Sequence, residues 1–165
     1  MKKIGLLSDT HSYFEPKLYE FFAEVDEIWH AGDIGSDEVL NELEQFKTVR
    51  AVYGNMDMTS LRYKIKETER FVCEGVDVCM THIEAGNPDK HEFSTNNPDK
   101  LKLFVCGHTH ILKIFRDKKL NLLHINPGAA GKTGPHSVQT AVRFVLDNGE
   151  IKDMEVFEKQ FRGNY

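Results

Sequence analysis

Short apolar runs that end in Asp, His or Asn are the feature that most restricts the fold of this 165-residue chain. Runs of four to seven apolar residues have the length of buried strands, and the polar residues after them mark the strand ends. The side chains that follow five such runs are Asp9 and His11, Asp33, Asn55, His82, and the pair His108 and His110. We therefore expect a sheet that gathers carboxylate, amide and imidazole groups along one edge.

The first third of the chain predicts strands that alternate with helices. Segments 15–25 and 36–46 carry apolar residues at helical spacing, with Pro16 early in the first and Ser36 or Asp37 as the cap of the second. The strands on either side of them are expected at 3–7, 27–30 and 49–53. This alternation favours a parallel sheet with crossover helices.

The rest of the chain is expected to be mostly β-structure. Apolar runs on both sides of short turns predict three hairpins, with turns at 74–75, 117–119 and 147–149. A glycine-rich bend is expected at 126–131, and the polar segment 83–97 is expected to be a loop with at most a short helix. We expect residues 1–165 to form a single domain.

Composition restricts the partners and the compartment. A net charge of −5 and a pI near 5.9 argue against a general nucleic-acid surface, so we expect no nucleic-acid partner beyond a small nucleotide. No apolar run is long enough to span a membrane, and the N-terminus does not resemble a signal peptide, so we expect a cytoplasmic protein without a membrane partner. Cys73, Cys79 and Cys106 lie within apolar runs without C-x-x-C spacing, which predicts buried thiols.

The polar residues at the strand ends indicate a function only when they are considered as a set. Taken alone, Asp9-x-His11 or Gly32-Asp33 is typical of a turn, and His82 is typical of a hydrogen-bonded histidine at a strand end. Together they offer Asp, Asn and His ligands, which suit borderline or hard divalent cations and differ from a thiolate zinc site. The set therefore predicts a pair of divalent cations at one edge of a sheet.

The chain resembles the calcineurin-like metallophosphoesterases over nearly its whole length. The motifs that carry the resemblance are, in order, Asp9-x-His11, Gly32-Asp33, Gly54-Asn55-x-Asp57, His82 and Gly107-His108-x-His110. The small size, the Asn126-Pro127-Gly128 bend and the Gly-Asn-x-Asp motif are similar to the compact bacterial and archaeal phosphodiesterase branch of YfcE-like proteins. The resemblance implies an α/β fold, a four-layer α-β-β-α sandwich of two mixed β-sheets with two metals at one end.

The resemblance also assigns roles to single residues. It gives Asp9, His11 and His110 to a first metal ion, Asn55, His82 and His108 to a second, and Asp33 to both. Asp57 would lie behind these ligands. The residues expected to carry catalysis are Asp33, Asn55, Asp57 and His82. We expect manganese first, although Ni, Fe, Co and Zn also suit these ligands.

Two cations about 3.5 to 4 Å apart can hold a bridging water whose pKa falls to about 7, which makes it a nucleophile at neutral pH. Neutral imidazole ligands add no negative charge, so the pair stays attractive to a phosphoryl group. We therefore expect in-line attack of a metal-bridging hydroxide on a small phosphoester, with a phosphodiester favoured.

The chain departs from the resemblance at two positions. Many relatives carry a histidine that protonates the leaving group where this chain has Met56, and a thioether cannot deliver a proton. After His82, Ile83-Glu84 replaces the usual Gly and His, which alters the rim of the pocket.

The four remaining histidines have weaker claims on the site. His30 and His136 are candidates to face it as proton donors or phosphate contacts, although neither is our favoured interpretation. His91 and His124 are expected at surface or structural positions.

Two other classes of function compete with hydrolysis. One is a non-catalytic metal-binding or protein-interaction scaffold of the same fold, and the other uses the histidines for metal storage or sensing. The ligand motifs are all present, which favours the enzyme. The sequence leaves open the physiological substrate, the native metal, any general acid and the oligomeric state, including a homo-oligomer.

Overall fold

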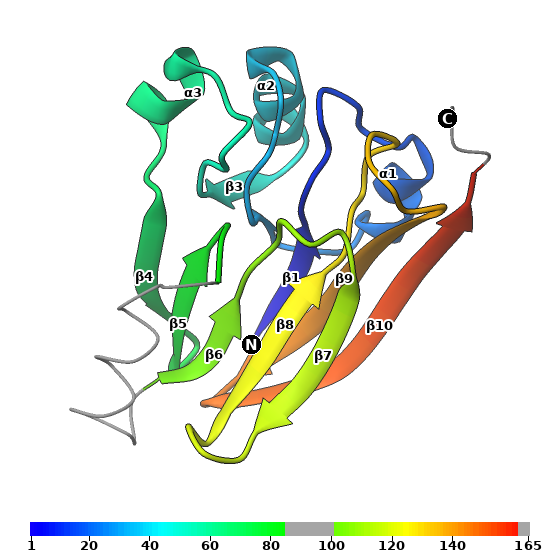
Figure 1. The fold of residues 1–165 in the computed structure, drawn as a ribbon. Coiled ribbons are helices and arrows are strands. Elements are labelled where there is room, and N and C mark those ends of the chain that lie inside the picture. Colours follow the sequence, from blue (N-terminus) through cyan, green and yellow to red (C-terminus); the bar gives the residue numbers. More distant parts are fainter. Residues whose placement is uncertain (85–100, 162–165) are drawn as a thin grey trace.

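Two five-stranded sheets packed face to face form the frame of the protein (Figure 1). The computed structural model describes residues 1–84 and 101–161. The first sheet has the order β10-β9-β1-β2-β3, and its strands are β1 (Lys2–Leu7), β2 (Glu27–His30), β3 (Thr48–Ala51), β9 (Val138–Asp147) and β10 (Glu150–Gln160). The second has the order β4-β5-β6-β8-β7, and its strands are β4 (Thr68–Cys73), β5 (Val76–Thr81), β6 (Leu101–Val105), β7 (Leu112–Asp117) and β8 (Leu122–Pro127).

Both sheets mix parallel and antiparallel strands. In the first sheet β1, β2 and β3 are parallel, as the strand–helix alternation predicted, and β9 and β10 join antiparallel. In the second sheet β5, β6 and β8 are parallel, and β4 and β7 are antiparallel edge strands. The α/β class with two mixed sheets is therefore confirmed.

Helices pack against the outer face of the first sheet: α1 (Lys17–Phe21), α2 (Asp37–Phe46) and α3 (Thr59–Lys64). The start of α2 agrees with the prediction, because the Ser36 hydroxyl accepts a hydrogen bond from the amide of Val39. The first helix is shorter than the expected 15–25. Phe22 and Val25 are buried against the sheet from a turn, so their spacing reflects burial and not helix.

Helix α3 was not predicted from the sequence. Only Leu61 of its six residues is buried, so the segment has no apolar stripe from which a helix could be recognised. The preceding strand, expected at 49–53, ends at Ala51, and Val52 instead forms an isolated bridge with Lys66.

The core between the sheets depends on alternation along the strands. Ile4 and Leu6 of β1 pack against the second sheet, while Leu7 belongs to the cluster under the helices. Gly5 permits close packing on the helix side, because a Cβ there would lie 2.7 Å from a ring carbon of Phe22. The strand is therefore buried on both faces, which explains its continuous apolar run.

The three hairpins are confirmed as the pairs β4–β5, β7–β8 and β9–β10. The polar segment 83–97 falls for the most part outside the described residues. No helix within 1–84 and 101–161 is long and apolar enough to cross a membrane. The strands β1, β5 and β6 point upward in Figure 1, and β2 runs parallel to β1, so the loops after these four strands lie at the same edge of the molecule.

Candidate metal centre

Loops after four strands carry most of the polar residues that the sequence singled out. They are Asp9 and His11 after β1, Asp33 after β2, His82 after β5, and His108 and His110 after β6. Five of these six have left-handed backbone, with φ of 54° at Asp9, 45° at His11, 53° at Asp33, 70° at His108 and 59° at His110. Such conformations cost about 1 kcal/mol or more each and gather at functional sites.

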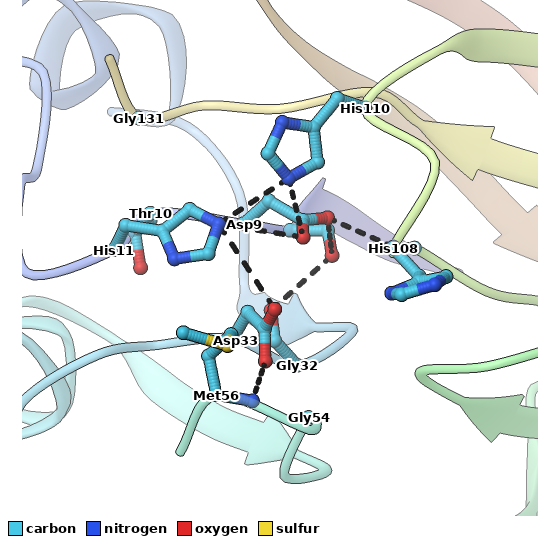
Figure 2. A network of polar contacts seen from close by, with 12 residues as sticks. Asp9, Thr10, His11, Gly32, Asp33, Gly54, Met56, His108, His110 and Gly131 are labelled. Atoms are coloured by element: carbon cyan, nitrogen blue, oxygen red, sulfur yellow. Dashed lines mark hydrogen bonds and ion pairs between the residues drawn. The ribbon is translucent and has the colours of Figure 1, made fainter. Parts of the chain in front are cut away.

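Asp9 lies in the middle of this cluster (Figure 2) and is fully buried. Its Oδ2 accepts hydrogen bonds from the Ser8 hydroxyl at 2.6 Å and from the backbone N–H of His108 at 3.1 Å. Its Oδ1 lies 3.1 Å from Nε2 of His110 and 3.8 Å from Nε2 of His11. One oxygen is thus held by the protein, and the other faces imidazole nitrogens.

Asp33 repeats this division on the next loop. Its Oδ1 accepts a hydrogen bond from the backbone N–H of Met56 at 2.8 Å. Its Oδ2 lies 3.2 Å from Nε2 of His82 and 4.0 Å from Nε2 of His11. Asp33 therefore stands between a histidine of the β1 loop and the histidine after β5.

The orientation of His82 follows from one backbone contact. Its Nδ1 lies 2.8 Å from the carbonyl oxygen of Ala31, and because a carbonyl can only accept, Nδ1 carries the proton. In the neutral ring, Nε2 then has a free lone pair. That nitrogen points at Asp33 and lies 3.9 Å from Oδ1 of Asp9, as a metal ligand would.

A second histidine, His136, orients His110 in the same way. Nε2 of His136 lies 3.0 Å from the carbonyl oxygen of Gly131, so this nitrogen donates. Nδ1 of a neutral His136 is then an acceptor, and it lies 3.1 Å from Nδ1 of His110, which must donate. The Nε2 lone pair of His110 is left facing Asp9.

These five residues, Asp9, His11, Asp33, His82 and His110, are called the Asp/His centre below. Two of its buried atoms, Asp9 Oδ1 and His82 Nε2, have no hydrogen-bond partner among the described residues. Two overlapping triads bring their ligand atoms within 4.8 Å of one another: Asp9, His11 and His110, and Asp9, Asp33 and His82. Lone pairs that face one another across so short a gap fit a divalent cation between them.

The pKa shifts of the two carboxylates and of His82 also favour a cation at this position. Burial raises the pKa of Asp9, but the adjoining rings of His110 and His82 and the hydrogen bond from Ser8 together outweigh burial and bring this pKa below its ordinary value. Burial also raises the pKa of Asp33, but the adjoining His82 ring, the amide of Met56 and the charge of His11 together outweigh burial and bring this pKa below its ordinary value. The pKa of His82 is lowered by burial but raised overall by Asp33 and Asp9. The ionised carboxylates therefore favour positive charge among these rings.

Three predicted site residues lie around the centre. The exposed ring of His108 lies beside His82, with ring centroids 5.3 Å apart. Asn55 is exposed on the β3 loop, next to the Met56 amide that binds Asp33. Asp57 is buried, and its two oxygens accept hydrogen bonds from the amides of Gly35 and Gly54, each at 2.8 Å. Asp57 thus ties the β2 and β3 loops together.

The other histidines take different positions. His30 is fully buried beneath the centre. Its Nδ1 accepts from the amide of Gly32, and its Nε2 lies 2.9 Å from the Thr10 hydroxyl. Burial lowers the pKa of His30 to about 4, so it is neutral and is not a proton donor at neutral pH. His124 is buried in β8 and is not a surface residue, whereas His91 lies outside the described residues.

Glycines let the loops approach one another. A Cβ on Gly107 would lie 2.0 Å from the Ser8 hydroxyl and 2.9 Å from Oδ2 of Asp9. A Cβ on Gly54 would lie 2.1 Å from Oδ1 of Asp33. The glycines of the Gly-Asn and Gly-His motifs are therefore needed for close contact with the carboxylates.

Sequence reasoning missed most of the groups that hold the ligands. Ser8 binds Asp9, the carbonyl of Ala31 fixes His82, and Asn126 donates to the carbonyl of Gly107 at 2.8 Å. Ser8 stands beside the Asp9-x-His11 motif and Asn126 belongs to the bend that the sequence did single out, but backbone carbonyls have no residue signature.

Comparison with known proteins gives one family, one curated relative and two solved structures. Residues 1–149 match the family described as the calcineurin-like phosphoesterase superfamily domain. A probable metallophosphoesterase of Methanothermobacter thermautotrophicus is 29% identical over 170 residues, which cover 93% of this chain and 90% of that protein. Among solved structures, Vps29 of Chaetomium thermophilum has a TM-score of 0.74 at 12% identity, covering 99% of this chain and all of that one (100%). The E. coli phosphoesterase YfcE has a TM-score of 0.60 at 19% identity, covering 93% of this chain and 98% of that one. Both solved structures are similar to this chain in fold.

Proposed function

This chain belongs to the calcineurin-like phosphoesterase superfamily, and on that premise we propose that it is a phosphodiesterase that acts on a small phosphoester with two divalent cations. The observation that carries the proposal is the orientation of the imidazoles. Backbone and side-chain acceptors fix His82 and His110 so that their free nitrogens face buried carboxylates. Such an arrangement is built for cations and not for internal hydrogen bonding.

We propose that the ligands divide between two ions. One would be held by the Asp9, His11 and His110 triad, and the other by Asn55, His82 and His108, with Asp33 shared. Asp33 suits this role because its Oδ2 lies between His11 and His82. Manganese is our first expectation for both positions, since carboxylate, amide and imidazole ligands without sulfur suit it.

Bound divalent cations supply Lewis acidity and an activated water. The chain itself fixes the carboxylates, because Ser8 and the amides of His108 and Met56 bind the oxygens that face away from the imidazoles. Asp57 keeps two of the loops in register. Preorganised groups of this kind need no rearrangement during the reaction, which is where electrostatic catalysis gains most.

Met56 limits the substrates. It is 64% exposed, and its amide binds Asp33, so its thioether stands at the rim where a proton donor would be useful. Because a thioether cannot protonate a leaving alkoxide, we propose substrates whose leaving group departs without that help, as aryl esters do.

The proposal is tested with Mn²⁺-loaded protein and an aryl phosphodiester, with the aryl monoester for comparison. We expect cleavage of the diester, and a loss of about 100-fold or more in kcat/KM for Asp9→Asn, which removes a charge from the ligand set. Asp117→Asn, in the β7–β8 turn, is the matched control and should keep wild-type activity. Metal binding without cleavage of either ester would contradict the proposal and favour a metal-binding scaffold.

A further inference from the structure

A second cluster of metal-ligating side chains lies away from the Asp/His centre. Glu84 follows β5, Cys106 follows β6, and His124 lies within β8, so three neighbouring strands of the second sheet contribute one residue each. We propose that these three residues, called the Cys site below, bind a zinc ion. This proposal does not depend on the proposed hydrolysis, since it involves none of the residues of the Asp/His centre.

The three donor atoms have the spacing of a tetrahedral site. Nε2 of His124 lies 3.6 Å from Sγ of Cys106 and 3.2 Å from Oε2 of Glu84, and all three atoms lie within 4.8 Å of one another. With ordinary zinc–ligand bond lengths, the edges of a tetrahedron are about 3.6 Å for sulfur to nitrogen and about 3.4 Å for nitrogen to oxygen. The side chains need little movement to enclose the ion.

The surroundings hold the ring and the thiol in place. His124 is 1% exposed and packs against two aromatic rings, with centroids 5.4 Å from Phe104 and 4.6 Å from Phe115. Cys106 is also 1% exposed, within the apolar cluster of β6. A buried site whose ligands are already oriented loses little side-chain entropy when the ion binds.

Glu84 opens the Cys site to solvent. Its side chain is 41% exposed, whereas the other two ligands are buried, so an ion can enter past the carboxylate. Three protein ligands leave the fourth position for water. On binding, the thiol of Cys106 would release its proton to solvent, so that a thiolate, an imidazole and a carboxylate surround the ion.

The position of the Cys site suggests what it does. Glu84 is two residues after His82, and Cys106 is two residues before His108. A bound ion would therefore tie the starts of the two loops that carry these histidines to β8. The ion would hold these loops together behind the Asp/His centre, and the site would be selective for thiophilic ions, whereas that centre offers no sulfur.

Cobalt distinguishes the two sites, because only a thiolate ligand gives Co²⁺ a strong near-ultraviolet charge-transfer band. Metal-free protein titrated with Co²⁺ should develop this band, and Zn²⁺ should displace it. Cys106→Ser should abolish the band. Cys73→Ser, which removes another buried thiol, is the matched control and should keep it. Asp9→Asn should also keep it, which separates this proposal from that of the Asp/His centre.

Other outcomes would overturn the proposal. If wild-type protein gave no thiolate band, or if Cys106→Ser kept it, the three residues would form only a hydrogen-bonded ion pair. His124→Gln and Glu84→Gln provide further variants in case Cys106→Ser does not fold. Each should weaken Zn²⁺ binding at this site by at least about tenfold in a competition titration, and unchanged Zn²⁺ affinity in both would contradict the site.

Discussion

The Asp/His centre and the Cys site use neighbouring strand ends but are carried by different backbone. In the first, Asp9, His11, Asp33 and His110 all have positive φ. In the second, none of the three residues does. Left-handed backbone is retained only where the surrounding structure enforces it. The comparison shows that the chain accepts strain to point side chains into the Asp/His centre, while the Cys site needs no positive-φ backbone.

The largest expected effect is a loss of activity from a substitution in the Asp/His centre that leaves the Cys site unchanged. Asp33→Asn removes the charge that lies between His11 and His82, and we expect about a 10³-fold loss of kcat on an aryl phosphodiester with Mn²⁺. The Co²⁺–thiolate band of the Cys site should be unchanged in the same variant. Residual activity within tenfold of the wild type would show that Asp33 is not a central ligand.

The second prediction concerns the pH dependence of the free energy of unfolding, which we attribute to His30 beneath the Asp/His centre. The pKa of buried His30 is about 4 in the folded protein, below the ordinary 6.5, so the unfolded chain takes up the proton first as the pH falls. The free energy of unfolding should therefore decrease as the pH falls through this window. The loss is about 2 kcal/mol between about pH 7 and about pH 5.

Urea unfolding of the metal-free protein measures this effect, with His30→Gln as the comparison. Glutamine can still bind Thr10 and Gly32 but does not titrate. The raised pKa of His82 changes stability in the opposite direction in both proteins, so the difference between them isolates His30. Equal pH dependence in the two proteins would refute the assignment.

A smaller effect tests the orientation of His110. His136→Phe keeps the ring contact with Phe161 but removes the acceptor for Nδ1 of His110, so the metal-facing tautomer is no longer fixed. We expect Mn²⁺ affinity to fall by at least about tenfold in a calorimetric titration. His136→Asn restores an acceptor and should recover part of the loss. Zn²⁺ affinity of the Cys site should not change, and equal Mn²⁺ affinity in both variants would exclude the orienting role.

The smallest effect is expected at the exposed rim of the Asp/His centre. Met56→His would place an imidazole where the leaving group departs, and we expect alkyl esters to gain by about tenfold or less in kcat. Aryl esters, which need no proton, should gain little. The ratio of the two rates is the measurement, and a ratio that did not move would argue that Met56 lies off the path of the leaving group.

The strand ends could be predicted from the sequence because apolar runs and the polar residues after them are local signals. Asp9, Asp33 and His82 were placed in this way, and the structure brings them together. The orienting partners could not be predicted, because His136 reaches His110 across 26 residues and the Ala31 carbonyl reaches His82 across 51. Helix α3 could not be predicted for another reason, because a single buried residue leaves no helical periodicity of apolar residues.

The Cys site could not be predicted from the sequence either, because its residues are distant from one another along the chain. Cysteine at the end of an apolar run reads as a core thiol, and His124 within a strand gives no sign that it faces Glu84 and Cys106. Only strand order brings the three together, because β6 lies between β5 and β8. Pairing of that kind depends on the whole sheet and not on neighbouring residues.

The contact between Asp9 and His110 has a consequence for the order in which the protein matures. The two residues are 101 positions apart, and His136, which orients His110, is further along the chain. A ribosome must therefore release most of the chain before the Asp/His centre can close. The cations proposed for this centre would bind only the finished fold, so the supply of metal should influence how much of the newly made protein survives degradation.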